Sequence, residues 1–273
     1  MNPNLSMLLT PTIPVSVRLL MPLLFWLLAP ARGFLAAGYS EFVRPALDSE
    51  PAAKARILIV TGGHEFDASG FVGMFQKMAG ISYEVVSFGQ GAEQRLTPRG
   101  ARDCDAIIFY DMHQDREPHW KGILQLLAQG KGVVFLHHSL WSYDGTWNDY
   151  SRIVGGRASS KEKVAPGASP TSTYKHGEHV HVHIAHPSDP VTRGLQDFDI
   201  TDETYNHYWV DPKVHVLLTT DNPTSEHIIA WSHLYEKSRI VYIELGHGPT
   251  AYENPNYSTL VRQAILWVVG EHP

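Results

Sequence analysis

The stretch Lys131-Gly-Val-Val-Phe-Leu-His-His-Ser139 decides the fold that we expect for this chain. Its apolar run, residues 133–136, has the length and the β-branched content of a strand, and it stops directly on two histidines. A continuous apolar run is typical of a parallel strand that is buried on both faces. We therefore interpret it as a central strand that ends at a ligand cleft, because clefts in open α/β sheets lie beyond the carboxyl ends of the strands.

Three other apolar runs also lead into a histidine. Residues 57–60 lead into His64, residues 107–110 into His113, and residues 240–245 into His247. One such ending is commonplace, whereas four of them indicate a shared site at one edge of a sheet.

The chain alternates between strand patterns and helix patterns. We expect strands over 56–60, 83–88, 106–110 and 133–136, a helix over 67–80 that Asp67 caps, and a helix over 117–129. Strands over 179–184, 214–219, 228–232 and 239–245 and a closing helix over 257–269 follow, while residues 155–177 look like an insertion. This alternation predicts a doubly wound, mostly parallel α/β sheet with helices on both faces.

Composition and charge indicate which class of molecule the protein binds. The net charge is −6 with neutral histidines, and lysine and arginine form no cluster, which argues against a nucleic-acid partner and favours a small molecule. The lone Cys104 precedes a strand at its amino end, so we expect an inert thiol away from the cleft.

The first residues have the pattern of a secretory signal peptide. Arg18 precedes the apolar residues 19–28, too short for a comfortable membrane span, and Ala29-Pro-Ala31 offers small residues for cleavage. We therefore expect a signal peptide over 1–31, a linker over 32–54, a folded domain over 55–273, and a periplasmic or secreted protein with no stable membrane span. An uncleaved anchor is the alternative.

Several candidate site residues have two interpretations. Gly62 and Gly63 either let a backbone approach a ligand or serve a tight turn. Of His137 and His138, one should face the cleft and the other should pack, unless the chain turns there. Glu203, in a segment that we expect to be a turn, is either a solvated cap or a general base or metal ligand.

A second group of histidines lies on one predicted strand. His179, His181 and His183 alternate, so they share a face that either binds zinc or is the solvated face of an edge hairpin. We favour the solvated face because nothing in the sequence ties this strand to the cleft. We also expect His176 and His186 to be ordinary surface residues.

From Arg56 onward the chain resembles the ThuA-like (trehalose utilisation) family. The resemblance rests on the order of several short stretches: Thr61-Gly-Gly-His-Glu-Phe66, the segment from Lys131 to His138, Gly155-Gly156, the segment from His186 to Leu195, Asp202-Glu203-Thr204-Tyr205, the segment from Arg239 to His247, and Leu266-Trp267 with Gly270. It implies a class I glutamine amidotransferase-like, flavodoxin-like three-layer sandwich.

The resemblance also implies roles for two histidines. His137 takes the position of the amidotransferase cysteine nucleophile, and His247 takes the position of the catalytic histidine. Without a thiol at the first position, amide hydrolysis through a thioester is excluded, so the chain is not a functional glutamine amidotransferase. Members of the family are linked to disaccharide and keto-sugar metabolism.

Our leading hypothesis is an exported sugar-processing enzyme, a hydrolase or lyase in carbohydrate catabolism, that acts on a disaccharide or keto-sugar. The residues that we expect to carry it are, for catalysis, His137, Glu203 and His247; for a divalent metal such as zinc, His64, His137 and His247; and for substrate binding, Gly62, Gly63, Trp141 and Tyr205.

Two other classes of protein stay open. The first is a non-catalytic carbohydrate-binding protein that stacks sugars on aromatic residues, namely Trp141, Tyr143, Trp147, Tyr205, Tyr208 and Trp209. The second is a metal carrier that uses His179, His181 and His183. The sequence makes no prediction of the oligomeric state or of the sugar.

Overall fold

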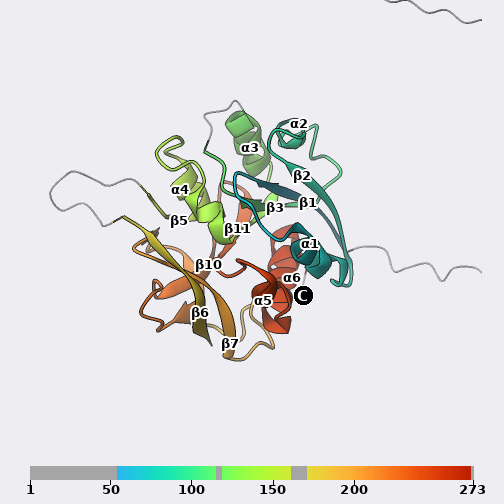
Figure 1. Ribbon diagram of the computed structural model, residues 1–273. Helices are drawn as coiled ribbons and strands as arrows, with labels where there is room; N and C mark the ends of the chain where they lie inside the picture. The colour runs from blue at the N-terminus through green and yellow to red at the C-terminus, as the bar shows by residue number, and fades with distance from the viewer. Residues whose placement is uncertain (1–53, 115–118, 161–170, 272–273) are drawn as a thin grey trace, which may run out of the picture. The chain divides into compact units, whose positions relative to one another are not determined.

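The computed structural model describes residues 54–114, 119–160 and 171–271 (Figure 1). The predicted signal peptide, and the predicted linker up to residue 53, lie outside these ranges. Within them, the helices are too short or too polar to cross a bilayer.

The centre of the fold is a nine-stranded sheet in the order β2-β1-β3-β4-β11-β10-β9-β6-β7. The strands are β1 (Ala55–Gly62), β2 (Ile81–Ser87), β3 (Ala106–Asp111), β4 (Gly132–Leu136), β6 (Thr173–Ile184), β7 (Phe198–Asn206), β9 (His215–Thr220), β10 (Ile228–Tyr235) and β11 (Ser238–Ile243). The neighbouring strands β2, β1, β3, β4 and β11 are parallel, which confirms the predicted α/β class. Beyond β11, the strands β10, β9, β6 and β7 extend the sheet through antiparallel pairs. A separate small sheet pairs β5 (Gly156–Arg157) with β8 (Trp209–Val210).

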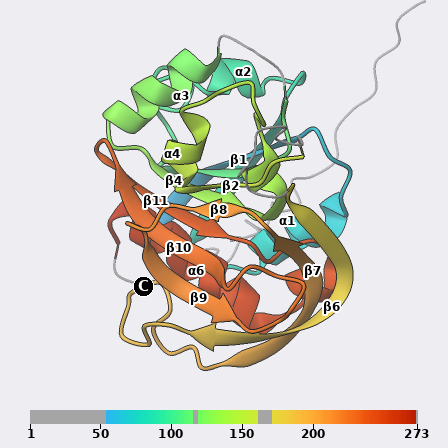
Figure 2. The same cartoon turned by 90° about the vertical axis from the view of Figure 1, so that its left-hand side faces the viewer.

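Helices cover both faces of this sheet (Figure 2). One face packs against α1 (Ala68–Gln76), α5 (Pro249–Tyr252) and α6 (Pro255–Val269), and the other against α2 (Ala92–Arg95), α3 (His119–Ala128) and α4 (Tyr150–Val154). The result is the three-layer sandwich that the sequence predicts.

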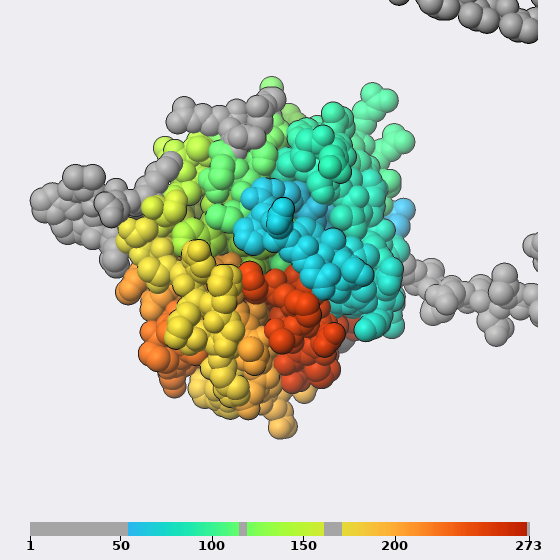
Figure 3. All heavy atoms as spheres, viewed as in Figure 1, coloured from blue at the N-terminus to red at the C-terminus, as the bar shows by residue number. Residues whose placement is uncertain are grey.

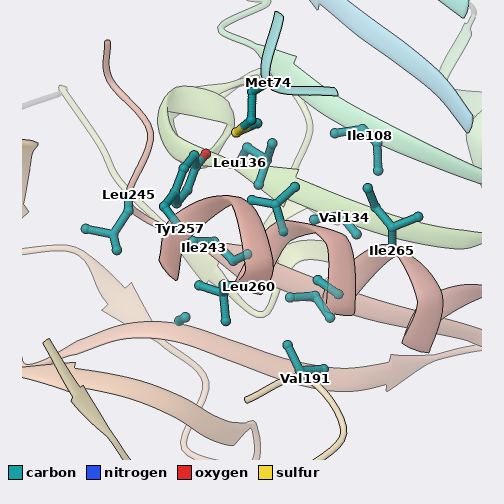
Figure 4. Packing of buried hydrophobic residues seen from close by; sticks show 14 of the residues in the cluster. Met74, Ile108, Val134, Leu136, Val191, Ile243, Leu245, Tyr257, Leu260 and Ile265 are labelled. Carbon is teal, nitrogen blue, oxygen red and sulfur yellow. The ribbon is translucent and has the colours of Figure 1, made fainter. Parts of the chain in front are cut away.

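Strand β4 shows why its sequence is an unbroken apolar run. Val134 and Leu136 point into the core beneath α6, while Val133 and Phe135 point into the core on the opposite face. Figure 4 shows Ile265 of α6 beside Val134. Because successive side chains of a strand alternate between faces, a strand with a core on each side has no position for a polar residue.

The two long helices of the first layer have the caps that their sequences indicate. The Asp67 side chain accepts a hydrogen bond from the Gly70 backbone N–H at 3.0 Å, so α1 begins where predicted, although it ends at Gln76 rather than near residue 80. Asn254 caps α6, and Gly270 ends it with a φ of +90°.

The largest differences from the sequence prediction are β6 and β7. Residues 198–206, whose acids we expected at a turn, form the edge strand β7. Strand β6 begins at Thr173, inside the expected insertion, and pairs with β7 on one side and β9 on the other, so it is not an edge strand. Polar residues that face the site and the solvent hide the strand pattern in both segments.

Candidate active site

The four strands that lead into histidines are neighbours in the parallel half of the sheet. Strands β1, β3, β4 and β11 are adjacent and parallel, so the residues that follow them lie at one edge of the sheet. His64, His137 and His247 approach one another there, whereas His113 stacks on Phe88 with ring centroids 4.0 Å apart. The shared-site prediction therefore holds for three of the four histidines.

The chain turns sharply where β4 ends. His137 has a φ of +50°, and a 3₁₀ turn, His137–Trp141, begins there. A positive φ is costly for a residue other than glycine and often marks a functional position. Because of this turn, His137 and His138 both reach the site, and both are buried. The alternative in which His138 packs away from the cleft is therefore wrong.

Three donor atoms form a close triangle at the centre of the site. His137 Nε2 lies 3.0 Å from Glu203 Oε2 and 3.1 Å from His247 Nδ1, and these last two atoms are 3.2 Å apart. Strand β7 supplies Glu203, the end of β4 supplies His137, and the loop after β11 supplies His247. The three residues that we expected to be catalytic are thus brought together.

The tautomer of His137 follows from its second ring nitrogen. His137 Nδ1 lies 2.6 Å from the backbone carbonyl oxygen of Glu244, which can only accept, so Nδ1 carries a hydrogen. In the neutral ring Nε2 then has only a lone pair, which the Tyr205 hydroxyl can approach as a donor at 2.8 Å. A lone pair facing the Glu203 carboxylate is unfavourable unless a cation, either a proton or a metal ion, lies between them.

Glu203 is held in its charged form. Burial alone would raise the pKa of Glu203, but hydrogen bonds and charge from His137 and His247 outweigh it and hold this pKa well below its usual range. The hydrogen bond to Glu203 raises the pKa of His247 in turn. Both carboxylate oxygens are engaged, since Glu203 Oε1 accepts from His176 Nδ1 at 2.9 Å.

His176 is a site residue that the sequence prediction missed. It lies on β6, and although its side chain is 61% exposed, it contacts Glu203. The expectation that nothing ties this strand to the cleft is therefore wrong. The signal was hidden because β6 starts inside a polar segment without an apolar pattern.

Asp202 positions the loop that carries His247. Its buried carboxylate accepts hydrogen bonds from the backbone N–H groups of Gly246 at 2.7 Å, His247 at 2.9 Å and Glu203 at 2.9 Å. Burial raises the pKa of Asp202 despite these bonds and the nearby His137. The carboxylate therefore fastens the loop after β11 to strand β7 and places His247 beside Glu203.

A cavity of about 250 Å³ reaches the triangle at Glu203, while His137 and His247 are not part of its lining. Its lining combines imidazoles, a carboxylate and aromatic rings: His64, Met112, His138, Trp141, Ser160, Tyr174, His176, Glu203 and Tyr205. Figure 3 shows the segments after β1 (blue), in β6 (yellow) and after β11 (red) meeting on one face. Of the residues that we expected to contact a ligand or metal, His64, Trp141, Glu203 and Tyr205 line the cavity.

Comparison with known proteins identifies the family of this chain. A family model described as ThuA, trehalose utilisation, matches residues 56–268. This chain belongs to the ThuA family. Among curated proteins, no sequence matches it.

Solved structures of the same fold come from several bacteria. A ThuA-like protein from Parabacteroides merdae is 15% identical, with a TM-score of 0.66 over 79% of this chain and 90% of that chain. One from Bacteroides uniformis is 18% identical, with a TM-score of 0.62 over 86% and 95%. A cytoplasmic protein from Salmonella typhimurium LT2 is 10% identical, with a TM-score of 0.56 over 78% and 99%. At these identities the likeness shows the fold alone.

The two glycines of the ThuA domain that we expected to contact substrate lie outside the cavity lining. Gly63 has a φ of +76°, and a Cβ there would lie 2.3 Å from the Met112 carbonyl oxygen. Gly62 has a φ of +131°, and a Cβ there would lie 3.3 Å from Phe88. Their position indicates that they let the loop after β1 pass close to its neighbours.

His64 lies at the rim of the site rather than in the triangle. Its ring stacks on His138 with centroids 4.8 Å apart, while the His247 ring is 6.5 Å away. It does not belong to the group of mutually close donor atoms, in which Glu203 takes the place that we expected for His64.

Other expected residues divide between core and surface. Of the aromatic residues considered for sugar stacking, Tyr143, Trp147 and Tyr208 are buried in the core, and Trp209 is exposed on β8 away from the cavity. Cys104 is buried at the amino end of β3, and burial raises the pKa of its thiol. Both features agree with the expectation of an inert thiol.

Proposed function

We propose that this ThuA domain binds a divalent transition metal ion, zinc or a similar ion, through His137, Glu203 and His247, and that it processes a disaccharide or keto-sugar there. The membership in a family described as trehalose utilisation supports the carbohydrate class. The observation that carries the proposal is the triangle of donor atoms with edges of 3.0 to 3.2 Å.

The donor set fits such an ion. Bonds of 2.0 to 2.2 Å in tetrahedral geometry put two ligand atoms about 3.4 Å apart, only a few tenths of an ångström more than the separations in the triangle. Two imidazoles and one carboxylate also leave a coordination position for water or substrate. The hydrogen bond from His137 Nδ1 to the Glu244 carbonyl is the outer contact that orients metal-binding histidines.

The same contacts divide the roles among the site residues. When bound, the ion would supply Lewis acidity toward a carbonyl or would lower the pKa of a water molecule. Glu203 suits a ligand better than a general base, because both of its oxygens already have partners. Without an ion, Tyr205 can donate toward the lone pair of His137 Nε2 at 2.8 Å. A bound ion would take that lone pair, and the Tyr205 hydroxyl would then be free to contact the ligand in the cavity that it lines.

The cavity supports a sugar as the molecule that is bound. Trp141 and Tyr174 provide aromatic surface, which stacks on the apolar faces of sugar rings. His138 lines the cavity, and neither of its ring nitrogens has a hydrogen-bond partner among the described residues. Burial holds the pKa of His138 well below its usual range, so the ring stays neutral. A sugar hydroxyl would provide the partner that such a buried group needs.

We further propose that the protein acts outside the cytoplasm. The apolar residues 19–28 and the small residues Ala29-Pro-Ala31 support export with cleavage near residue 31. Mass spectrometry of the protein from its native host tests this part independently, and a mature chain that keeps residues 1–31 would contradict it.

Turnover on a panel of disaccharides and 3-keto-glycosides tests the enzymatic part. We expect activity that a chelator removes and zinc restores, and a large loss of turnover in Glu203→Gln, which keeps the size of the side chain. His186→Ala removes an exposed imidazole far from the cavity and serves as the control. Sugar binding without turnover in any metal state would favour the second candidate, a carbohydrate-binding protein, which the aromatic lining also supports.

A further inference from the structure

A second group of histidines and carboxylates lies on the outer face of β6 and β7. Val180 and Val182 of β6 are buried in the core, so the alternating His181 and His183 point away from it. Asp199 lies directly opposite His181 on β7, and Asp197 lies next to His183. The two rings are close, with centroids 4.7 Å apart.

Histidines are the ion-pair partners of the negative charges on this face. Asp197, Asp199 and Asp221 form ion pairs only with histidines in the described ranges, and none with lysine or arginine. Neutral imidazoles leave the three carboxylates uncompensated. A divalent cation would balance most of that charge.

Each of the two imidazoles has one nitrogen toward an outer carboxylate. His181 Nδ1 donates to Asp199 Oδ1 at 2.9 Å, which leaves Nε2 with its lone pair. His183 Nε2 lies 3.6 Å from Asp221 Oδ2, too far for a hydrogen bond but within range of an ion pair. The hydrogen bond between His181 and Asp199 is the usual outer contact of a metal-binding histidine.

Asp197 completes a set of three ligands. Its Oδ1 accepts the Ile184 backbone N–H at 2.8 Å, which fixes the carboxylate, and its Oδ2 lies 3.0 Å from His183 Nδ1. The donor atoms of His181, His183 and Asp197 all lie within 4.8 Å of one another. Modest side-chain rotation would bring them around one ion.

We propose that His181, His183 and Asp197 form a second site for a divalent transition metal ion, separate from the cavity. Two imidazoles and one carboxylate favour zinc or a similar ion over calcium or magnesium, which prefer oxygen ligands alone. The bound ion would fasten β6 to the start of β7, the strand that carries Glu203 farther along. Its role is structural, because no residue of the cavity belongs to it.

Equilibrium dialysis of the tag-free full chain against zinc, followed by elemental analysis, tests this site. We expect the double variant His181→Ala with His183→Ala to bind one zinc ion fewer per chain than the unmodified protein. Asp199→Asn, which removes the outer carboxylate of His181, should weaken that site roughly tenfold. Because Asp199→Asn keeps the size of the side chain, we expect it to fold. Its zinc affinity therefore tests the site even if the double variant does not fold.

The control is the double variant His186→Ala with His215→Ala, which removes two exposed, stacked imidazoles elsewhere. It should bind as much zinc as the unmodified protein. Equal zinc content in the His181/His183 variant and the unmodified protein would overturn the proposal, as would an equal loss in the control. Because the test uses a difference of one ion, its outcome is independent of whether the cavity site binds zinc.

Discussion

His137 combines three properties in one residue. It has a positive φ, its side chain is fully buried, and its Nδ1 is fixed by the Glu244 carbonyl oxygen. Packing alone would not require a strained histidine at the end of a strand. The strain is understandable if the position exists to hold Nε2 beside Glu203 and His247.

Asp202 gives a prediction about positioning. Asp202→Asn replaces one carboxylate oxygen by an N–H₂ group, so it loses the acceptor either for the Gly246 N–H or for the N–H groups of His247 and Glu203, and in both cases the loop is held less firmly. Buried donors without partners cost about 1–3 kcal/mol, so the free energy of unfolding should fall by that amount. Zinc affinity of the cavity site should fall as well, because His247 is no longer held. Denaturant unfolding and calorimetric titration measure the two effects, and unchanged zinc affinity would contradict the role.

Asp111 gives a prediction about pH. Burial raises the pKa of Asp111 to about 7, although hydrogen bonds from Ser142 and the His113 backbone oppose this. Between pH ~4 and 7 the unfolded chain releases this proton while the folded chain keeps it, so stability falls as pH rises, by about 1.4 kcal/mol per unit of separation. Asp111→Asn should remove the part of this pH-dependent loss of stability that comes from Asp111. Unfolding free energies at pH 4, 5.5 and 7 check it, and parallel profiles for both proteins would refute it.

Cys104 gives a prediction of no effect on catalysis. It lies at the amino end of β3, away from the strand ends that carry the site. Cys104→Ser should therefore leave turnover and zinc content unchanged, with at most a small loss of stability. A loss of turnover in a protein with the normal unfolding temperature would show that the thiol takes part.

At the scale of single elements, α1 offers a clean test of its cap. Asp67 is exposed, and its side chain accepts the Gly70 N–H at 3.0 Å. Asp67→Ala should reduce the free energy of unfolding by about 1 kcal/mol, which is typical of a lost N-cap. Urea denaturation measures it, with Asp67→Ser, which keeps an acceptor, as the matched control that should lose less.

The elements that could be predicted are those whose burial is uniform. Strand β4 is apolar at every position because it has a core on both faces, and α6 has the period and caps of an amphipathic helix. The first part of β6 and the whole of β7 escaped prediction, because residues 173–177 are polar and mostly exposed and because β7 buries the polar residues Asp202, Glu203 and Thr204. In β7, buried polar residues stand where a strand usually has the apolar residues that identify it.

The same contrast applies to the site residues. His137 and His247 could be predicted because each follows an apolar run that ends at the same edge of the sheet. His176 and Asp202 could not, because their roles depend on the pairing of β6 with β7, which connects residues far apart in sequence. No local pattern carries that pairing.

At the scale of the described domain, the site joins two halves of one sheet. The parallel half supplies His137 and His247 at its carboxyl edge, and the antiparallel extension supplies His176 and Glu203. Asp202 connects the halves through the backbone of the His247 loop. A change that loosens the extension should therefore affect the site even when the parallel core is intact.

The most direct test of the central claim is a crystal structure of the zinc-loaded protein with anomalous data at the zinc edge. The His181→Ala with His183→Ala background removes the proposed surface site from the measurement. We predict an anomalous peak within bonding distance of His137 Nε2, Glu203 Oε2 and His247 Nδ1, at the side of the cavity that Glu203 lines. The absence of a peak at this triangle in crystals saturated with zinc would contradict the account.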